Sequence, residues 1–235
     1  MTEDRGFPGR WVGGTALILG PLLLLTGTLL RAPFPFFFPH QIAAATAHPV
    51  LMTAAYSAFL AGNVLMGPAV VTLARNIGLR RPAWAAWGGT LVVVGLFERT
   101  FHAGIDHAAF TVVRHRGPEA ATGFVTDLYQ DLHLFSFLSF TIMFGWYVLA
   151  IGAYLSGALG RIRSIALATM GLLPLGVLKG TEIVSIIGTT GLVVALLPAG
   201  VRLLRGGPRP SRKAILLTGP AVLGLAALGY VSTLG

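Results

Sequence analysis

Cysteine is absent from this sequence of 235 residues, and acidic residues are scarce. The lack of cysteine excludes disulfides, thiolate metal sites and c-type haem attachment. Asp and Glu number eight in all, and charged residues make up 11% of the chain, whereas an ordinary globular protein carries about 25%. No polar stretch is long enough to form a soluble domain with its own core. A soluble fold is therefore not expected.

Apolar residues, in contrast, make up 54% of the chain. They form runs of roughly 20 nearly uncharged residues, each long enough to cross a hydrocarbon layer about 30 Å thick. The first run, Val12–Leu30, is too long for the core of a signal peptide, and no small-residue cleavage site follows it. We interpret it as a retained span. The sequence predicts an all-α, polytopic membrane helix bundle that forms one transmembrane domain over residues 1–235 and is located in the cell membrane.

The runs divide into seven predicted spans. The division between the fifth and sixth spans depends on a turn at Lys179–Glu182, because residues 164–204 are too many for one crossing. If that turn is re-entrant, the number of spans falls to six. The predicted spans are Val12–Leu30, Pro49–Leu73, Ala83–Phe110, Leu132–Leu159, Ser164–Val177 (interrupted by Pro174), Thr181–Leu204 and Lys213–Leu234.

Basic residues predict the orientation of these spans. The net charge is +9, and most Lys and Arg residues lie in the short gaps between apolar runs. With the N-terminus in the cytoplasm, twelve of them lie inside and four outside, which agrees with the positive-inside rule. We therefore predict a cytoplasmic N-terminus and an external C-terminus. The same distribution argues against nucleic acid as a partner.

Small residues and prolines predict local structure. Gly88 and Gly95, and likewise Gly145 and Gly152, recur at heptad spacing, which is typical of close helix packing in membranes. The segment Pro33–Pro39 cannot form a regular helix and is expected at the outer interface. Residues between the third and fourth spans, including Glu119 and Asp127, are expected to form an external loop.

Ionisable residues gather on the predicted outer side. Glu98 lies fifteen residues into the third span, about 22 Å along the helix and still within the hydrocarbon layer. A carboxylate at that depth is costly without a partner, and it is a functional hypothesis by default. The other residues on this side are Asp106, Glu119, Asp127, Asp131 and Glu182, with His40, His48, His102, His107, His115 and His133.

Helical spacing selects the candidate catalytic residues from this set. Glu98, His102 and Asp106 are four residues apart and share one helix face. We assign Glu98 as the general acid or base, with Asp131 and His102 as residues that orient or assist it. Asp106, Glu182 and His133 form a second group. The alternative is a polar network that only fixes helix packing.

Aromatic residues surround this acidic group in the sequence. A carboxyl group in an apolar cavity has a raised pKa and can act as an acid, and aromatic faces stabilise cations. We expect the substrate cavity to be lined by Phe97, Phe101, Trp84, Phe137, Phe140, Phe144 and Trp146. In size, span count and this acidic and aromatic pattern, the chain resembles the small integral-membrane terpene cyclases. That resemblance implies protonation-initiated cyclisation of an isoprenoid and transfers no catalytic residue.

Three other functions stay open at this stage. A metal-dependent hydrolase is the first, although no cofactor is expected. Its oxygen and nitrogen ligands would be Glu98, His102 and Asp106 or His107, with His133 and Asp131 opposite. The segment Gly104–His107 is similar to the Gly-x-Asp-His motif of nickel-permease-type proteins, but the upstream His-Pro is missing. Transport of a small solute or metal ion is disfavoured because the polar groups crowd one side. The third is a non-catalytic accessory protein. Expected partners are membrane lipids and an apolar small-molecule substrate.

Overall fold

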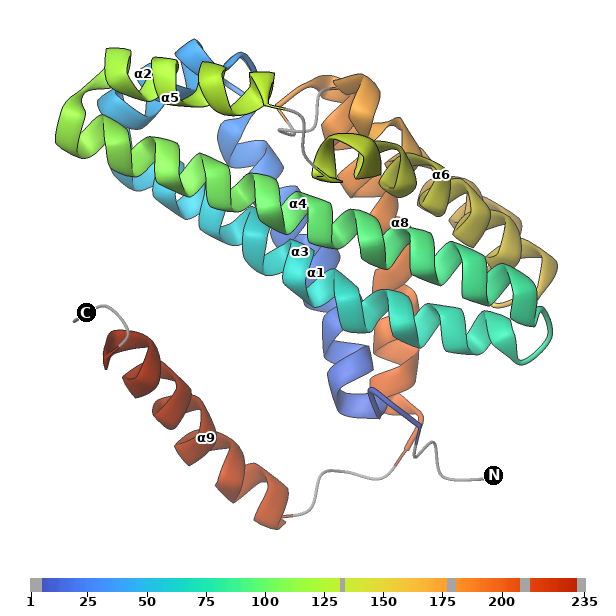
Figure 1. The fold of residues 1–235 in the computed structure, drawn as a ribbon. Helices are drawn as coiled ribbons and strands as arrows, with labels where there is room; N and C mark the ends of the chain where they lie inside the picture. The colour runs from blue at the N-terminus through green and yellow to red at the C-terminus, as the bar shows by residue number, and fades with distance from the viewer. Residues whose placement is uncertain (1–5, 132–133, 177–180, 208–211, 232–235) are drawn as a thin grey trace. The chain divides into compact units, whose positions relative to one another are not determined.

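The computed structural model describes residues 6–131, 134–176, 181–207 and 212–231. In these residues every regular element is helical, which confirms the predicted all-α class. The chain divides into two compact units, Met1–Leu204 and Arg205–Gly235 (Figure 1). The organisation of the whole chain as one transmembrane domain stays a prediction.

Four helices in the described residues are long and apolar enough to cross a membrane. They are α1 (Arg10–Arg31), α3 (Pro49–Gly78), the stretch Ser136–Leu155 of α6 (Leu134–Leu155), and α8 (Ile183–Arg205). They correspond to the predicted first, second, fourth and sixth spans. These four helices make the protein compatible with a membrane bundle, but the count of seven spans is not confirmed.

The other three predicted spans take different forms. The third lies within α4 (Pro82–Arg116), a helix of 35 residues that carries Glu98 and Arg99 and is less apolar for that reason. The fifth is replaced by two short elements, α7 (Arg161–Ala168) and the 3-10 helix η1 (Thr169–Gly176). Pro174 lies within η1 and lacks the N–H that a continuous α-helix requires. The seventh corresponds to α9 (Arg212–Val231), whose apolar part, Leu216–Val231, is shorter than the four spans.

Two short helices occupy segments in which no regular helix was expected. Helix α2 (Phe38–Ala47) begins inside the Pro33–Pro39 segment, because Pro39 stands in its first turn, where a missing N–H costs nothing. Helix α5 (Pro118–Gln130) replaces the predicted external loop, and Gly117, with φ of 86°, turns the chain between α4 and α5. Helices α2 and α5 lie side by side at one end of the bundle (Figure 1).

Close helix packing at glycines joins α4 to α6. A Cβ atom on Gly88 would lie 2.8 Å from the Leu149 Cα, and one on Gly145 would lie 2.7 Å from the Val92 backbone nitrogen. Gly95 and Gly152 meet the partner helix in the same way. The packing role predicted from the heptad spacing of these glycines is confirmed.

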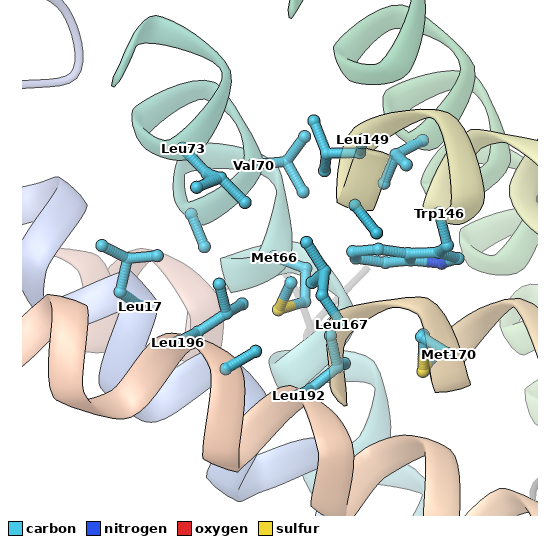
Figure 2. Close-up of a cluster of buried hydrophobic side chains, with 14 of the residues drawn as sticks. Leu17, Met66, Val70, Leu73, Trp146, Leu149, Leu167, Met170, Leu192 and Leu196 are labelled. Carbon is cyan, nitrogen blue, oxygen red and sulfur yellow. The ribbon is translucent and has the colours of Figure 1, made fainter. Parts of the chain in front are cut away.

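The apolar core lies among α1, α3, α4, α6, α7, η1 and α8. Figure 2 shows Met66 and Val70 of α3 facing Leu149 and Trp146 of α6, with Leu167 and Leu192 below them. Trp146 is 1% exposed. The buried carboxylates of α4, Glu98 and Asp106, do not belong to this core.

Candidate functional site

Glu98 and His102 form a hydrogen-bonded pair on α4. The Glu98 side chain is fully buried, and its Oε1 lies 2.9 Å from the His102 Nε2. One helical turn separates the two residues, so the pair forms on one helix without strain. The His102 side chain is 18% exposed. The sequence prediction that these two residues act together is therefore matched by their geometry, while their catalytic role stays a prediction.

Tyr129 of α5 extends this pair toward the surface. The Tyr129 hydroxyl lies 3.2 Å from the His102 Nδ1, and the two rings stack with centroids 5.8 Å apart and planes 9° from parallel. The neutral imidazole satisfies both contacts when Nε2–H donates to Glu98 and Nδ1 accepts from the tyrosine hydroxyl. Tyr129 is 47% exposed. A continuous path of hydrogen bonds thus leads from a buried carboxylate to a residue at the molecular surface.

The environment of Tyr129 keeps its hydroxyl protonated. Burial of the ring raises the pKa of Tyr129, and the negative charges of Asp106 and Glu98 raise it further. Phe38 of α2 contacts the Tyr129 ring with centroids 6.3 Å apart, and Phe101 meets the His102 ring edge-on. Aromatic contacts therefore hold the imidazole and the phenol in place from α2, α4 and α5.

Two buried arginines balance the buried carboxylates. Arg31, at the end of α1, is 1% exposed, and Arg99 is 6% exposed, while Glu98 and Asp106 are 0% and 8% exposed. The Arg31 guanidinium lies 4.4 Å and the Arg99 guanidinium 5.2 Å from the centroid of the Phe59 ring. Two cations and two anions are a nearly neutral group, which lowers the cost of burying each charge.

Helices α2 and α3 complete this end of the bundle with a second hydrogen-bonded set. The Tyr56 hydroxyl donates to the Gln41 Oε1 at 3.1 Å, and the Gln41 Nε2 donates to the Pro35 carbonyl at 2.6 Å. Tyr56 also lies beneath the Arg31 guanidinium, 4.5 Å from ring centroid to carbon. This set fixes the Pro- and Phe-rich segment against α3.

The sequence analysis missed three members of this site: Arg31, Tyr56 and Tyr129. Arg31 directly follows an apolar run and was counted only as an external charge. A signal was available, because an arginine at a span end beside an intramembrane carboxylate is a natural counter-ion. The tyrosines carried no such signal, since their contacts depend on how α2, α3 and α5 fold together.

The other predicted catalytic residues differ in their burial. Asp106 lies two turns along α4 and is buried, as the shared helix face predicts. Asp131, which follows α5, and Glu182, which precedes α8, are both exposed. His133 and Lys179 lie outside the described residues. Of the predicted set, His102 lies within hydrogen-bonding distance of Glu98.

The predicted lining aromatics do not share one cavity. Phe97, Phe137, Phe140 and Phe144 are between 54% and 68% exposed. Trp146 belongs to the apolar core, and Trp84 packs against it. Phe101 contacts the Glu98–His102 pair through the His102 ring. Exposed aromatics on membrane-crossing helices normally face lipid, which explains why sequence proximity to Glu98 did not place them around it.

A shallow groove of about 830 Å³ separates α2 from α5. It is mainly apolar, with Glu119 and Asp127 on the α5 side and Pro39 on the α2 side. Within the described parts of the chain, no three His, Asp or Glu residues lie close enough together to hold a metal ion. Comparison with protein-family models, curated proteins and solved structures gives no match to this chain.

Proposed function

We propose that this protein is an integral membrane enzyme that acts on an apolar, lipid-like substrate by acid/base chemistry, with Glu98 as the proton donor. The observation that carries the proposal is the hydrogen-bonded path from the Glu98 carboxylate through His102 to Tyr129. A polar network that only fixes helix packing has no need of titratable groups between the buried carboxylate and the surface. A catalytic acid needs such groups, because it must regain a proton from solvent after each turnover.

In the proposed reaction, Glu98 in its acid form transfers its proton to a carbon–carbon double bond, leaving a carboxylate and a carbocation on the substrate. The rearranged cation then releases its proton to water. The His102 Nε2–H returns a proton to Glu98 while Nδ1 takes one from the Tyr129 hydroxyl, which is renewed by water, so that the proton released and the proton supplied balance. Exchange of the ring protons with water restores the Nε2–H tautomer of His102 before the next turnover. Isoprenoid cyclisation is the specific reaction of this kind that we propose.

The proposal requires access to a buried carboxylate. Helix α5 is thirteen residues long and supplies Tyr129 to the path. The groove between α5 and α2 separates these two helices along one side. We propose that α5 moves aside to admit the substrate from the membrane interface, at which the Pro33–Pro39 segment lies.

Deuterium incorporation tests this function without knowledge of the substrate. The purified protein is incubated with a total membrane lipid extract in D₂O, the lipids are returned to H₂O, and carbon-bound deuterium is measured by mass spectrometry. The wild type is expected to label at least one lipid. Glu98→Gln is expected to abolish that labelling, while Asp127→Asn, an exposed carboxylate on α5, is expected to retain it.

Two results would contradict the proposal. Full labelling by Glu98→Gln removes Glu98 as the acid. No labelling by the wild type removes the enzymatic function, and proton-coupled flux of small solutes and metal ions into liposomes then tests the transport alternative. The metal-dependent alternative is tested by elemental analysis of the same purified protein.

A further inference from the structure

A second apolar groove, of about 600 Å³, runs between α3 and α4. Val64, Val71 and Val93 contribute to its walls, and Phe7 and Pro8 of the N-terminal segment close one end. Arg75 of α3 holds that segment in place, because its Nη1 donates to the Gly6 carbonyl at 2.9 Å. Among its lining residues there is no Asp, Glu, Lys, Arg or His, so the groove suits an uncharged occupant.

Asn63, a residue of the groove lining, carries an unsatisfied acceptor. Its side chain is 3% exposed, and its Nδ2 donates to the Leu96 carbonyl and to the Thr100 Oγ1, both at 3.0 Å. The carbonyl accepts only, so it fixes which end of the amide is the nitrogen. The Oδ1 is buried, and within the described chain no group donates to it. A buried oxygen of this kind costs free energy until a donor reaches it.

Helix α3 offers a second acceptor beside the first. Pro68 has no N–H, so the carbonyl of Val64 loses its usual partner one turn along the helix. Gly67, between them in the groove lining, leaves open space, since nothing lies within 4 Å of a Cβ atom built on it. The Asn63 Oδ1 and the Val64 carbonyl oxygen are therefore two acceptors that a hydrogen-bond donor in the groove would satisfy.

The length and the apolar lining of the groove limit the kind of ligand that can carry this donor. From Asn63 to Val71 the lining extends over eight residues of α3, which is roughly 12 Å. The rest of the lining is apolar apart from Thr100, whose hydroxyl donates to the Leu96 carbonyl. A single alkyl chain with one hydroxyl at its end matches both the polar end and the apolar length.

We propose that this groove binds a long-chain primary alcohol, whose hydroxyl donates to the Asn63 Oδ1 and whose chain lies along α3 toward Phe7. The site is distinct from the acid/base site. Its α4 residues are Val93, Leu96, Phe97 and Thr100, and Glu98 is absent from the lining. Leu96 and Thr100, which lie beside Asn63, are about 200° around the helix from Glu98. The proposal therefore goes beyond the proposed enzymatic function and does not depend on it.

Photo-crosslinking tests the site in the full-length protein. A diazirine-bearing 1-dodecanol is the probe, and labelled peptides are mapped by mass spectrometry. Labelling is expected on α3 and α4, and unlabelled 1-dodecanol is expected to compete about tenfold more strongly than dodecane, because only the alcohol supplies the donor. Dodecyl phosphate is expected to compete poorly, since no cation lines the groove.

Two variants in α3 make the test specific. Gly67→Leu fills open space in the groove without touching the core and is expected to abolish labelling. Ala61→Leu adds a comparable side chain at an exposed position outside the groove and is expected to label as the wild type does. In Asn63→Leu, unlabelled 1-dodecanol is expected to compete with the probe no more strongly than dodecane does.

Equal competition by dodecane and 1-dodecanol in the wild type would overturn the proposal, as would stronger competition by dodecyl phosphate. Labelling that persists in Gly67→Leu would overturn it as well. A Glu98→Gln protein is expected to bind the probe normally, so loss of the acid chemistry and loss of this site are distinguishable.

Discussion

At the scale of single residues, Tyr129 connects the buried acid to the solvent. Its pKa is raised by burial and by two carboxylates, so the folded protein favours the protonated phenol. The protonated Tyr129 therefore contributes to the free energy of unfolding. That contribution is fully present below the ordinary tyrosine pKa of 10.0 and is lost as the pH rises from there through the higher pKa of the folded state. We expect thermal stability to fall above about pH 10 in the wild type and to fall less steeply in Tyr129→Phe. Melting curves at several pH values compare the two, and an identical pH dependence would contradict the assignment.

Arg31 supports the site by balancing charge. Its guanidinium stacks on Tyr56 and Phe59, and its removal leaves two buried carboxylates with one buried arginine. Arg31→Met is expected to destabilise the protein by about 3 kcal/mol, as is usual when one partner of a buried charge set is removed. Arg202→Met, at an exposed position on α8, is the matched control and is expected to change stability little. Denaturation in detergent measures both, and equal effects would contradict the balancing role.

At the scale of elements, the glycine contacts set the separation of α4 and α6. Gly88→Ala places a methyl group against the Leu149 backbone and is expected to cost about 1–3 kcal/mol. Gly104→Ala, in the same helix but with open space around it, is expected to be neutral or slightly stabilising. The difference in melting temperature between the two variants tests the contact, and a Gly88→Ala protein as stable as Gly104→Ala would contradict it.

Some helices and contacts were predictable from the sequence, and others were not. The apolar runs predicted seven spans, and four of them correspond to helices long and apolar enough to cross a membrane. The heptad glycines predicted close helix packing, which occurs between α4 and α6. Both predictions depend on local composition and spacing. Helix α5 was missed although Gly117-Pro118 is a good helix start, since a short amphipathic helix has no apolar run. The Glu98–His102 pair was predictable because it lies within one helix. The contact of His102 with Tyr129 joins residues 27 apart, and no periodicity encodes it.

At the scale of the whole molecule, the ends of the helices differ in charge. Arg75, Arg80 and Arg161 lie at or next to ends of α3 and α7, whereas Glu119 and Asp127 lie in α5. We propose that the arginine-rich end faces the cytoplasm and that α4 crosses the membrane as well. Single cysteines test this without background labelling, because the chain has none. Asp127→Cys is expected to react with an impermeant maleimide on intact cells, and Leu79→Cys only after lysis. The reverse pattern would invert the orientation.

The path from Glu98 leads through His102 to Tyr129 on α5. On the proposed function and orientation, the catalytic proton is drawn from the external face. An energised membrane keeps that face the more acidic of the two, so the acid is recharged fastest when the cell is respiring. A reaction that consumes no nucleotide and reduces no cofactor would then still follow the metabolic state of the cell, through the protonmotive force alone.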